Sequence, residues 1–270
     1  MLDWTDLVLA YTGYLTTVAW MVPRFGRARL PATMGFIAAA AGWWLWSPMA
    51  GRDDLTALVA HVFVPSLALL AAYQVSGAFF LAPNRPLERG LLHVDETTLH
   101  RTGLLHAYRR APTAVRELFE LMYLLVYVML PIGATVLVLG GQGARLGHYW
   151  TVVFAAELAC YGMLPWLQTR PPRALEDEPM PRERSGPLRR LSLAVLARGS
   201  IQVNTIPSGH AAGAVAIAFA VGSAMPVAGA AFLVLATGIT LATVLGRYHY
   251  LADSLLGVAV AIAAWAALGG

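Results

Sequence analysis

The chain has 270 residues, of which 58% are hydrophobic and only 13% are charged, and its mean hydropathy is +0.60. A water-soluble domain of this length cannot bury so much apolar surface, so the composition excludes a soluble globular protein and indicates a polytopic membrane protein. The formal net charge is +4, and all 19 basic residues are arginine. The single cysteine, Cys160, excludes an intrachain disulfide bond.

Eight apolar stretches approach the length needed to cross a bilayer, about 20 residues of helix. Because lipid offers the backbone no hydrogen-bond partners, each stretch is predicted to be helical. The first lacks a basic start and a small-residue cleavage site, so we interpret it as a retained span and not as a signal peptide. The sequence therefore predicts an all-α, polytopic transmembrane bundle of about eight spans. The stretches are Leu7–Val22, Leu30–Trp46, Leu55–Leu81, Leu118–Leu139, Tyr149–Leu167, Pro207–Ala224, Val227–Leu245 and Leu251–Leu268.

Two long polar segments interrupt the spans, at Pro83–Pro112 and Gln168–Ile206. Within the second, Pro187–Arg198 mixes leucine and valine with arginine, which is typical of a short amphipathic helix lying on lipid headgroups. An ordinary surface helix of a loop fits this pattern equally well. We expect residues 1–147 to form N-terminal transmembrane helices that include the polar segment at 83–112. Residues 148–270 are expected to form a catalytic core on the last four spans.

The polar residues that can carry chemistry fall on one side of the predicted bundle. With eight spans, both termini share a near face, and both polar segments lie on the opposite, far face. Pro207–His210, at the start of the sixth span, and Arg247–Asp253, between the seventh and the eighth, also fall on the far face. This convergence predicts a single site there.

The far-face stretch "GRYHYLAD" contains His249 and Asp253, four residues apart. At the start of a helix this spacing puts both side chains on one face. The carboxylate can then hold one imidazole nitrogen and make the other a better nucleophile or base. Arg247, just before them, supplies a planar cation suited to phosphate. The alternative is that the three residues only cap a helix at the membrane interface.

The stretch "IPSGH" opens the sixth span. Ser208 and Gly209 would lie at a helix N-terminus, where unpaired N–H groups and the helix dipole attract an anion and glycine lets the backbone come close. His210 would lie beside that anion, placed to donate a proton to a leaving oxygen. At the end of the fifth span, Arg170 or Arg173 could reach back to the same anion, or could only anchor the helix end.

Together these residues resemble the motifs of the phosphatidic-acid-phosphatase type 2 family of membrane lipid phosphatases. In that family three motifs, roughly K-x6-R-P, P-S-G-H and S-R-x5-H-x3-D, build one phosphate site. Arg170-Pro171 matches the end of the first motif, and Pro207–His210 matches the second in full. His249-x3-Asp253 matches the end of the third.

The resemblance implies a reaction and a role for each matching residue. His249 would attack phosphorus, Asp253 would orient it, and His210 would protonate the leaving group. No metal ion or cofactor would take part. The phosphoryl oxygens would be held by Arg170, Ser208, Gly209 and an arginine of the third motif.

The match departs from the family at two cationic positions. The family's lysine position holds Met163 and its arginine position holds Thr243, and Arg173 and Arg247 could take their places. The stretch "YHYLAD" is similar to the third motif of the inositol-phosphorylceramide synthases. Tyr161 followed by prolines is similar to their proline-rich motif. That related branch transfers a phosphoryl-alcohol headgroup between lipids.

Glu157 lies near the middle of the fifth span, one turn before Tyr161. An ionisable group at that depth costs roughly 2.5–3.5 kcal/mol on insertion scales, so a functional role is the first hypothesis for this pair. A hydrogen-bonded structural glutamate is the alternative.

We therefore expect an enzyme that hydrolyses a lipid phosphate monoester through a phosphohistidine intermediate. Its partners would be the phosphorylated lipid and the bilayer. We expect it to bind no nucleic acid. Transfer of a headgroup between lipids is the alternative reaction. A non-catalytic transporter or binding protein for anionic lipids is the alternative of another class, and the oligomeric state stays open.

The signals for sidedness disagree. Arg52 and Arg145 fall on the near face, whereas the other 17 arginines fall on the far face, which the positive-inside rule places in the cytoplasm. Members of the family mostly act on the extracytoplasmic side. We expect a bacterial cell-membrane protein whose active face is cytoplasmic.

Overall fold

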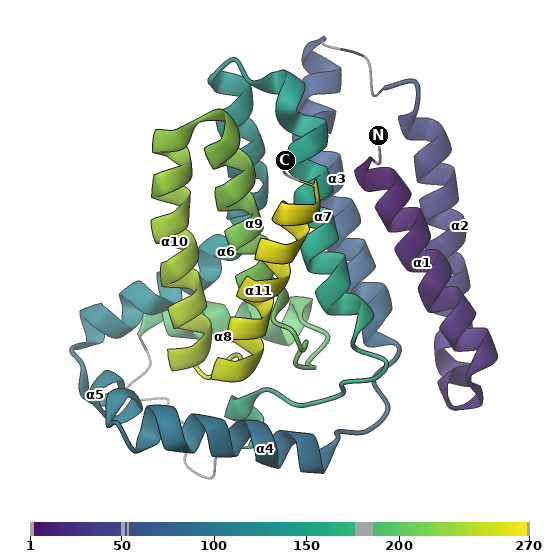
Figure 1. Cartoon of the computed structure of the whole chain (residues 1–270). Helices are drawn as coiled ribbons and strands as arrows, with labels where there is room; N and C mark the ends of the chain where they lie inside the picture. The colour runs from purple at the N-terminus through teal and green to yellow at the C-terminus, as the bar shows by residue number, and fades with distance from the viewer. Residues whose placement is uncertain (1–2, 50–51, 53, 176–185, 269–270) are drawn as a thin grey trace.

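Long helices account for most of the fold, as predicted. The computed structural model describes residues 3–49, 52, 54–175 and 186–268, and Figure 1 shows the helices packed side by side in a bundle. Each predicted span overlaps one long helix, so the prediction of an all-α membrane bundle is confirmed. These helices are α1 (Trp4–Met21), α2 (Arg29–Trp46), α3 (Leu55–Gly77), α6 (Thr113–Leu139), α7 (Leu146–Gly162), α9 (Gly209–Ala224), α10 (Pro226–Leu245) and α11 (Leu251–Leu268).

Four of these helices, α3, α6, α10 and α11, are long and apolar enough to cross a membrane. A fifth, α9, is apolar but has 16 residues. The predicted number of about eight spans therefore stays a prediction. Both chain ends lie toward one end of the bundle in Figure 1, as an even number of spans requires.

Shorter helices gather at the opposite end of the bundle, which is the far face predicted from the sequence (Figure 1). In the polar segment at 83–112, α4 (Arg85–Asp95) runs through a π-helical turn (Glu96–His100) into α5 (Leu104–Arg110). In the second polar segment, α8 (Pro187–Gly199) confirms the predicted short helix. Residues 176–185 of that segment lie outside the described residues. Three short 3-10 segments complete the described elements, at Pro23–Ala28, Gly143–Arg145 and Pro172–Ala174.

Local sequence explains where the site-bearing helices begin. Asn84 caps α4 by accepting a hydrogen bond from the Leu87 N–H at 3.1 Å. Ser208 caps α9 in the same way, with the Ala211 N–H as donor. Pro226 starts α10, where its missing N–H costs no intrahelical hydrogen bond.

The core of the bundle is the pair α7 and α9. The α7 side chains Tyr149, Trp150 and Phe154 are almost fully buried. Most of α9 is alanine or glycine, and small side chains let α7, α10 and α11 pack closely around it. At the close contact with α11, a Cβ on Gly257 would overlap the Ser208 carbonyl oxygen. The central helix thus holds the PSGH stretch against α11.

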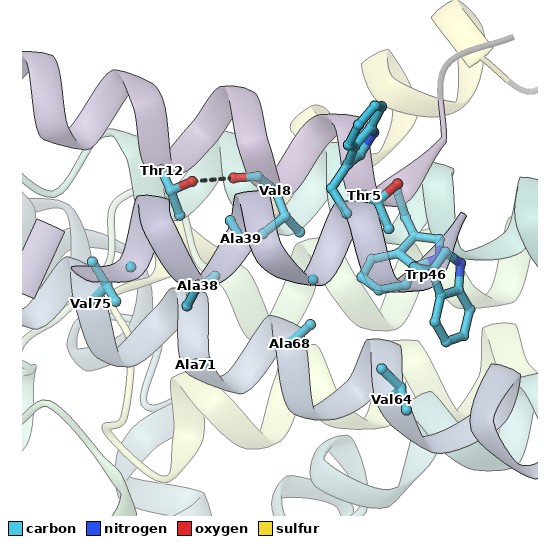
Figure 2. Close-up of a pocket in the computed structure, with 15 residues that line it drawn as sticks. Thr5, Val8, Thr12, Ala38, Ala39, Trp46, Val64, Ala68, Ala71 and Val75 are labelled. Carbon is cyan, nitrogen blue, oxygen red and sulfur yellow. Dashed lines mark hydrogen bonds between the residues drawn. The ribbon is translucent and has the colours of Figure 1, made fainter. Parts of the chain in front are cut away.

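A separate crevice of about 210 Å³ lies among α1, α2 and α3 (Figure 2). Its lining is almost entirely apolar, with Val8, Ala68 and Trp46 among its walls. Thr12 projects there, but its hydroxyl is satisfied by the Val8 carbonyl at 2.8 Å. The crevice shares no lining residue with the cavities at the histidines described below.

The crossing of α9 and α10 depends on one glycine. A Cβ on Gly229 would overlap the backbone of Gly222, whereas a Cβ on Gly222 would make an ordinary 3.4 Å contact. We predict that Gly229→Ala destabilises the protein by about 1–3 kcal/mol through overpacking, and that Gly222→Ala stays close to wild type. The measurement is the midpoint of thermal unfolding in detergent. Equal midpoints for the two variants would contradict the packing described here.

Candidate active site

The structure brings His249, Asp253 and His210 to one place at the far face. The Nδ1 of His249 lies 3.2 Å from the Oδ2 of Asp253, one turn along the chain. The same Oδ2 accepts a hydrogen bond from the Asn204 side-chain amide at 2.6 Å. The centroids of the His249 and His210 rings are 5.2 Å apart. Two imidazoles therefore lie side by side, and one of them is oriented by a buried carboxylate.

The backbone around His249 is held by a sharp reversal between α10 and α11. Helix α10 ends at Leu245, and Arg247 adopts a left-handed conformation with φ +61°. The N–H groups of Tyr248 and His249 then both donate to the Thr243 carbonyl, at 2.9 and 3.0 Å. The Ser208 N–H donates to the Asp253 carbonyl at 2.9 Å, which ties α9 to α11. These contacts fix the relative positions of the two histidines.

Aromatic stacking holds His210. The ring of Tyr123, from α6, stacks on His210 with a centroid distance of 5.4 Å and an interplanar angle of 11°. The ring of Tyr248 also stacks on Tyr123, with a centroid distance of 3.8 Å. The Nε2 atom of His210 is buried and has no hydrogen-bond partner among the described residues. An unpaired buried nitrogen is costly, so this atom is a natural place for a proton donor or acceptor from a ligand.

Arg173 lines the same small cavity as both histidines. Its guanidinium lies 5.3 Å from the centroid of the Tyr248 ring, and no carboxylate of the described residues pairs with it. Burial lowers the pKa of Arg173, while the nearby rings of Tyr123 and Tyr248 act in the opposite direction. A partly buried cation without a carboxylate partner is poised to bind an anion.

The other two candidate arginines are neutralised by carboxylates of α4. Arg170 donates to Glu88 through Nε at 3.1 Å and Nη2 at 2.8 Å, and its backbone N–H donates to the same carboxylate at 2.8 Å. Arg247 pairs with Asp95 at 2.5 Å. Neither arginine is among the residues that line the cavity. Their proposed contact with phosphate would require these ion pairs to open.

The start of α9 lies next to His210, and most of its first backbone N–H groups have acceptors within the protein. Ser208 is fully buried as the N-cap of α9, and the Gly209 N–H makes a long 3.4 Å contact with Thr205 Oγ1. A Cβ on Gly209 would lie 2.5 Å from the Tyr161 ring, so only glycine fits there. The N–H groups of Ser208 and Ala211 also donate within the protein, and neither Ser208 nor Gly209 is among the residues that line the cavity. The expected contact of this helix terminus with an anion next to His210 therefore stays a prediction.

The two positions where the chain departs from the family motifs carry no cation into the site. Met163 is 40% exposed on the surface. Thr243 is buried, and its hydroxyl bonds to the Thr240 carbonyl and contacts the Ser254 hydroxyl. Of the two arginines expected to compensate, Arg173 reaches the cavity and Arg247 turns away to Asp95.

Glu157 and Tyr161, both from α7, line a groove together with His210. The Tyr161 hydroxyl donates to one carboxyl oxygen of Glu157, and Tyr161 lines the cavity beside His210. Glu157 itself is 6% exposed and lines a larger groove that adjoins this cavity. The structure therefore places this pair next to the site rather than elsewhere in the bundle.

Sequence reasoning missed three residues that shape the site, Tyr123, Asn204 and Tyr248. Tyr248 adjoins His249, and Asn204 begins the stretch "NTIPSGH", so both had a local signal. Tyr123 comes from a helix far away in the sequence, and nothing near it indicates its contact with His210.

Residues 89–267 match the family model described as the PAP2 superfamily. The chain belongs to the PAP2 superfamily. The match confirms the resemblance seen in the motifs and extends it upstream, through most of α4 and through α5 and α6. It supports a phosphatase-type or phosphotransferase-type lipid enzyme with helices embedded in the membrane. No curated protein and no solved structure gave a significant match to the chain.

A comparison of two arginines tests which of them binds phosphate. We predict that Arg173→Gln lowers kcat/KM for a lipid phosphate by about 10- to 100-fold, because a charge-assisted contact to the phosphoryl oxygens is lost. It should also weaken inhibition by inorganic phosphate.

The matched control is Arg170→Gln, together with Glu88→Gln. If the Arg170–Glu88 pair is structural, the two single variants should lower thermal stability to a similar degree and leave phosphate inhibition close to wild type. A loss of phosphate inhibition in Arg170→Gln and not in Arg173→Gln would reverse the assignment.

Proposed function

We propose that this protein removes the phosphate group from a lipid phosphate monoester through a phosphohistidine at His249. The observation that carries the proposal is the pair of imidazoles, His249 held by Asp253 and His210 beside it, next to the cation of Arg173. Binding an anion does not need two histidines, one of them oriented by a buried carboxylate. A non-catalytic lipid transporter is therefore the weaker interpretation.

The reaction divides into two steps. In the first, the Nε2 of His249 attacks phosphorus, the P–O bond to the lipid breaks, and His210 donates a proton to the leaving alcohol. Asp253 accepts the Nδ1–H of His249 and stabilises its positive charge. In the second step, His210 takes a proton from water, the water oxygen attacks phosphorus, and the P–N bond breaks to release inorganic phosphate.

Positioning and electrostatics supply most of the catalysis in such a transfer. Arg173 and the N-terminus of α9 would hold the phosphoryl oxygens as charge shifts between the attacking and the leaving atoms. The stack of Tyr123 on His210 would keep the acid in place. The chain needs no metal ion for these steps, and activity should persist in excess EDTA.

A second reaction has one specific observation in its favour. Because Arg170 and Arg247 are paired with Glu88 and Asp95, Arg173 is the arginine of the described residues that lines the cavity. A phosphodiester carries one fewer negative charge than a monoester and needs fewer cations. The second candidate is therefore transfer of a phosphoryl-alcohol headgroup to another lipid. In that reaction a lipid hydroxyl, and not water, attacks phosphorus in the second step.

One assay with purified protein separates the two reactions. We predict that radiolabelled lipid phosphate monoester releases inorganic phosphate, and that a phosphodiester lipid supplied with an alcohol acceptor shows no headgroup exchange. His249→Ala and His210→Ala should each lower turnover by about 10²–10⁴-fold, and Asp253→Asn should lower it less. Exchange without phosphate release would establish the transferase. Near-normal turnover of His249→Ala would contradict both reactions.

We also propose that the end of the bundle bearing α4, α5 and α8 lies in the cytoplasm, on the strength of the arginine distribution. Gly90 is exposed on α4, and a Cβ there would have no neighbour within 4 Å, so the position accepts cysteine. In a Cys160→Ser background, Gly90→Cys on intact cells should resist an impermeant thiol reagent, and Ala144→Cys at the opposite end should react. Strong labelling at Gly90→Cys would place the active face outside.

A further inference from the structure

A mainly apolar groove of about 250 Å³ runs from His210 to the flank of the bundle. Residues of α3, α6 and α7 line most of it, and His210 lies at its inner end, where it adjoins the small catalytic cavity. Leu67 and Leu70, among its lining residues, are 65% and 50% exposed on the outer surface. In a bilayer that surface faces lipid tails. The groove therefore suits the hydrocarbon chain of a lipid whose phosphate lies at His249.

Within this apolar lining lies one carboxyl group, that of Glu157. The Tyr161 hydroxyl donates to its Oε2, and the side chain is 6% exposed. Its Oε1 has no hydrogen-bond partner among the described residues. On the side of α9 the carboxyl packs against Gly213, where a Cβ would overlap Oε1. This oxygen keeps some accessible surface although the residue is nearly buried, and Glu157 lines a groove that fits a lipid. An accessible oxygen without a partner at such a place points to a polar group on the ligand.

The position of Glu157 indicates which part of the lipid it meets. Gly213, its contact on α9, is three residues after His210, or about 4.5 Å deeper along the helix axis. A phosphoryl group between the two histidines thus places the first carbons of the lipid, and not its tail end, beside Glu157. On the second carbon, a substituent is separated from phosphorus by only the ester oxygen and two carbons.

We propose that Glu157 is a specificity-determining residue that binds a hydroxyl or amide N–H on the second carbon of the substrate. The preferred class would be lysoglycerophosphates or sphingoid-type phosphates, and not polyprenyl phosphates, which carry no donor there. A site built to hydrogen-bond such a group discriminates against an analogue that lacks it, because the carboxyl oxygen is then left unpaired. The inference rests on the proposed function and names its substrate class.

The test uses a matched pair of substrates, 1-acylglycerol 3-phosphate and its 2-deoxy analogue. Wild-type protein should favour the hydroxyl substrate by at least about 10-fold in kcat/KM. Glu157→Leu should bring the ratio close to one, and Glu157→Gln, whose amide can still hydrogen-bond, should retain part of the preference. Thr151→Val, which removes another buried polar group of the same helix, should keep the wild-type ratio.

A binding measurement with the phosphonate analogues of both lipids keeps the inference separate from the proposed function, because it needs no turnover. Wild-type protein should bind the hydroxyl phosphonate at least about 10-fold more tightly, and Glu157→Leu should not. Discrimination in binding without any turnover would sink the proposed function and leave the inference standing. The inference would be overturned if wild-type protein bound both phosphonates equally. It would also be overturned if Glu157→Gln lost affinity for both phosphonates to the same degree, and Glu157 would then be structural.

Discussion

A single buried carboxylate organises the far end of this bundle. Asp253 accepts from the His249 ring and the Asn204 amide through one oxygen, and its backbone carbonyl accepts from the Ser208 N–H. These bonds join α11 to the PSGH stretch of α9. Its other carboxylate oxygen, Oδ1, is buried and has no hydrogen-bond partner among the described residues. Since a buried carboxylate is costly without hydrogen bonds, Asp253 depends on the two that Oδ2 accepts, and the orientation of His249 and the position of α9 depend on each other.

The distribution of arginines follows from the same need to compensate charge. Helix α4 lies across the end of the bundle and presents Glu88 and Asp95 to Arg170 and Arg247. Arg189, from α8, pairs with Glu120. With these cations satisfied by the protein itself, Arg173 is the arginine of the described residues that lines the cavity at the histidines. The ion pairs thus hold the short helices in place, whereas Arg173 pairs with no carboxylate of the described residues.

The sequence predicted what depends on local spacing. The helices follow from apolar stretches that must satisfy their backbones internally. The pairing of His249 with Asp253 follows from a four-residue separation, and the cap at Ser208 from its place before a helix. The fates of Arg170 and Arg247 could not be predicted in this way, because their partners on α4 are 82 and 152 residues away. The contact of Tyr123 with His210 could not be predicted for the same reason, because the two residues are far apart in the sequence.

The most direct test of the account is to trap the covalent intermediate. Wild-type protein mixed with a lipid phosphate radiolabelled at phosphorus and quenched within a turnover should carry label that is stable to alkali and labile to acid, as a phosphohistidine is. Peptide mapping should place the label on His249, and His249→Ala should carry none. Full turnover by wild-type protein without any labelled histidine, or label retained in His249→Ala, would contradict the account.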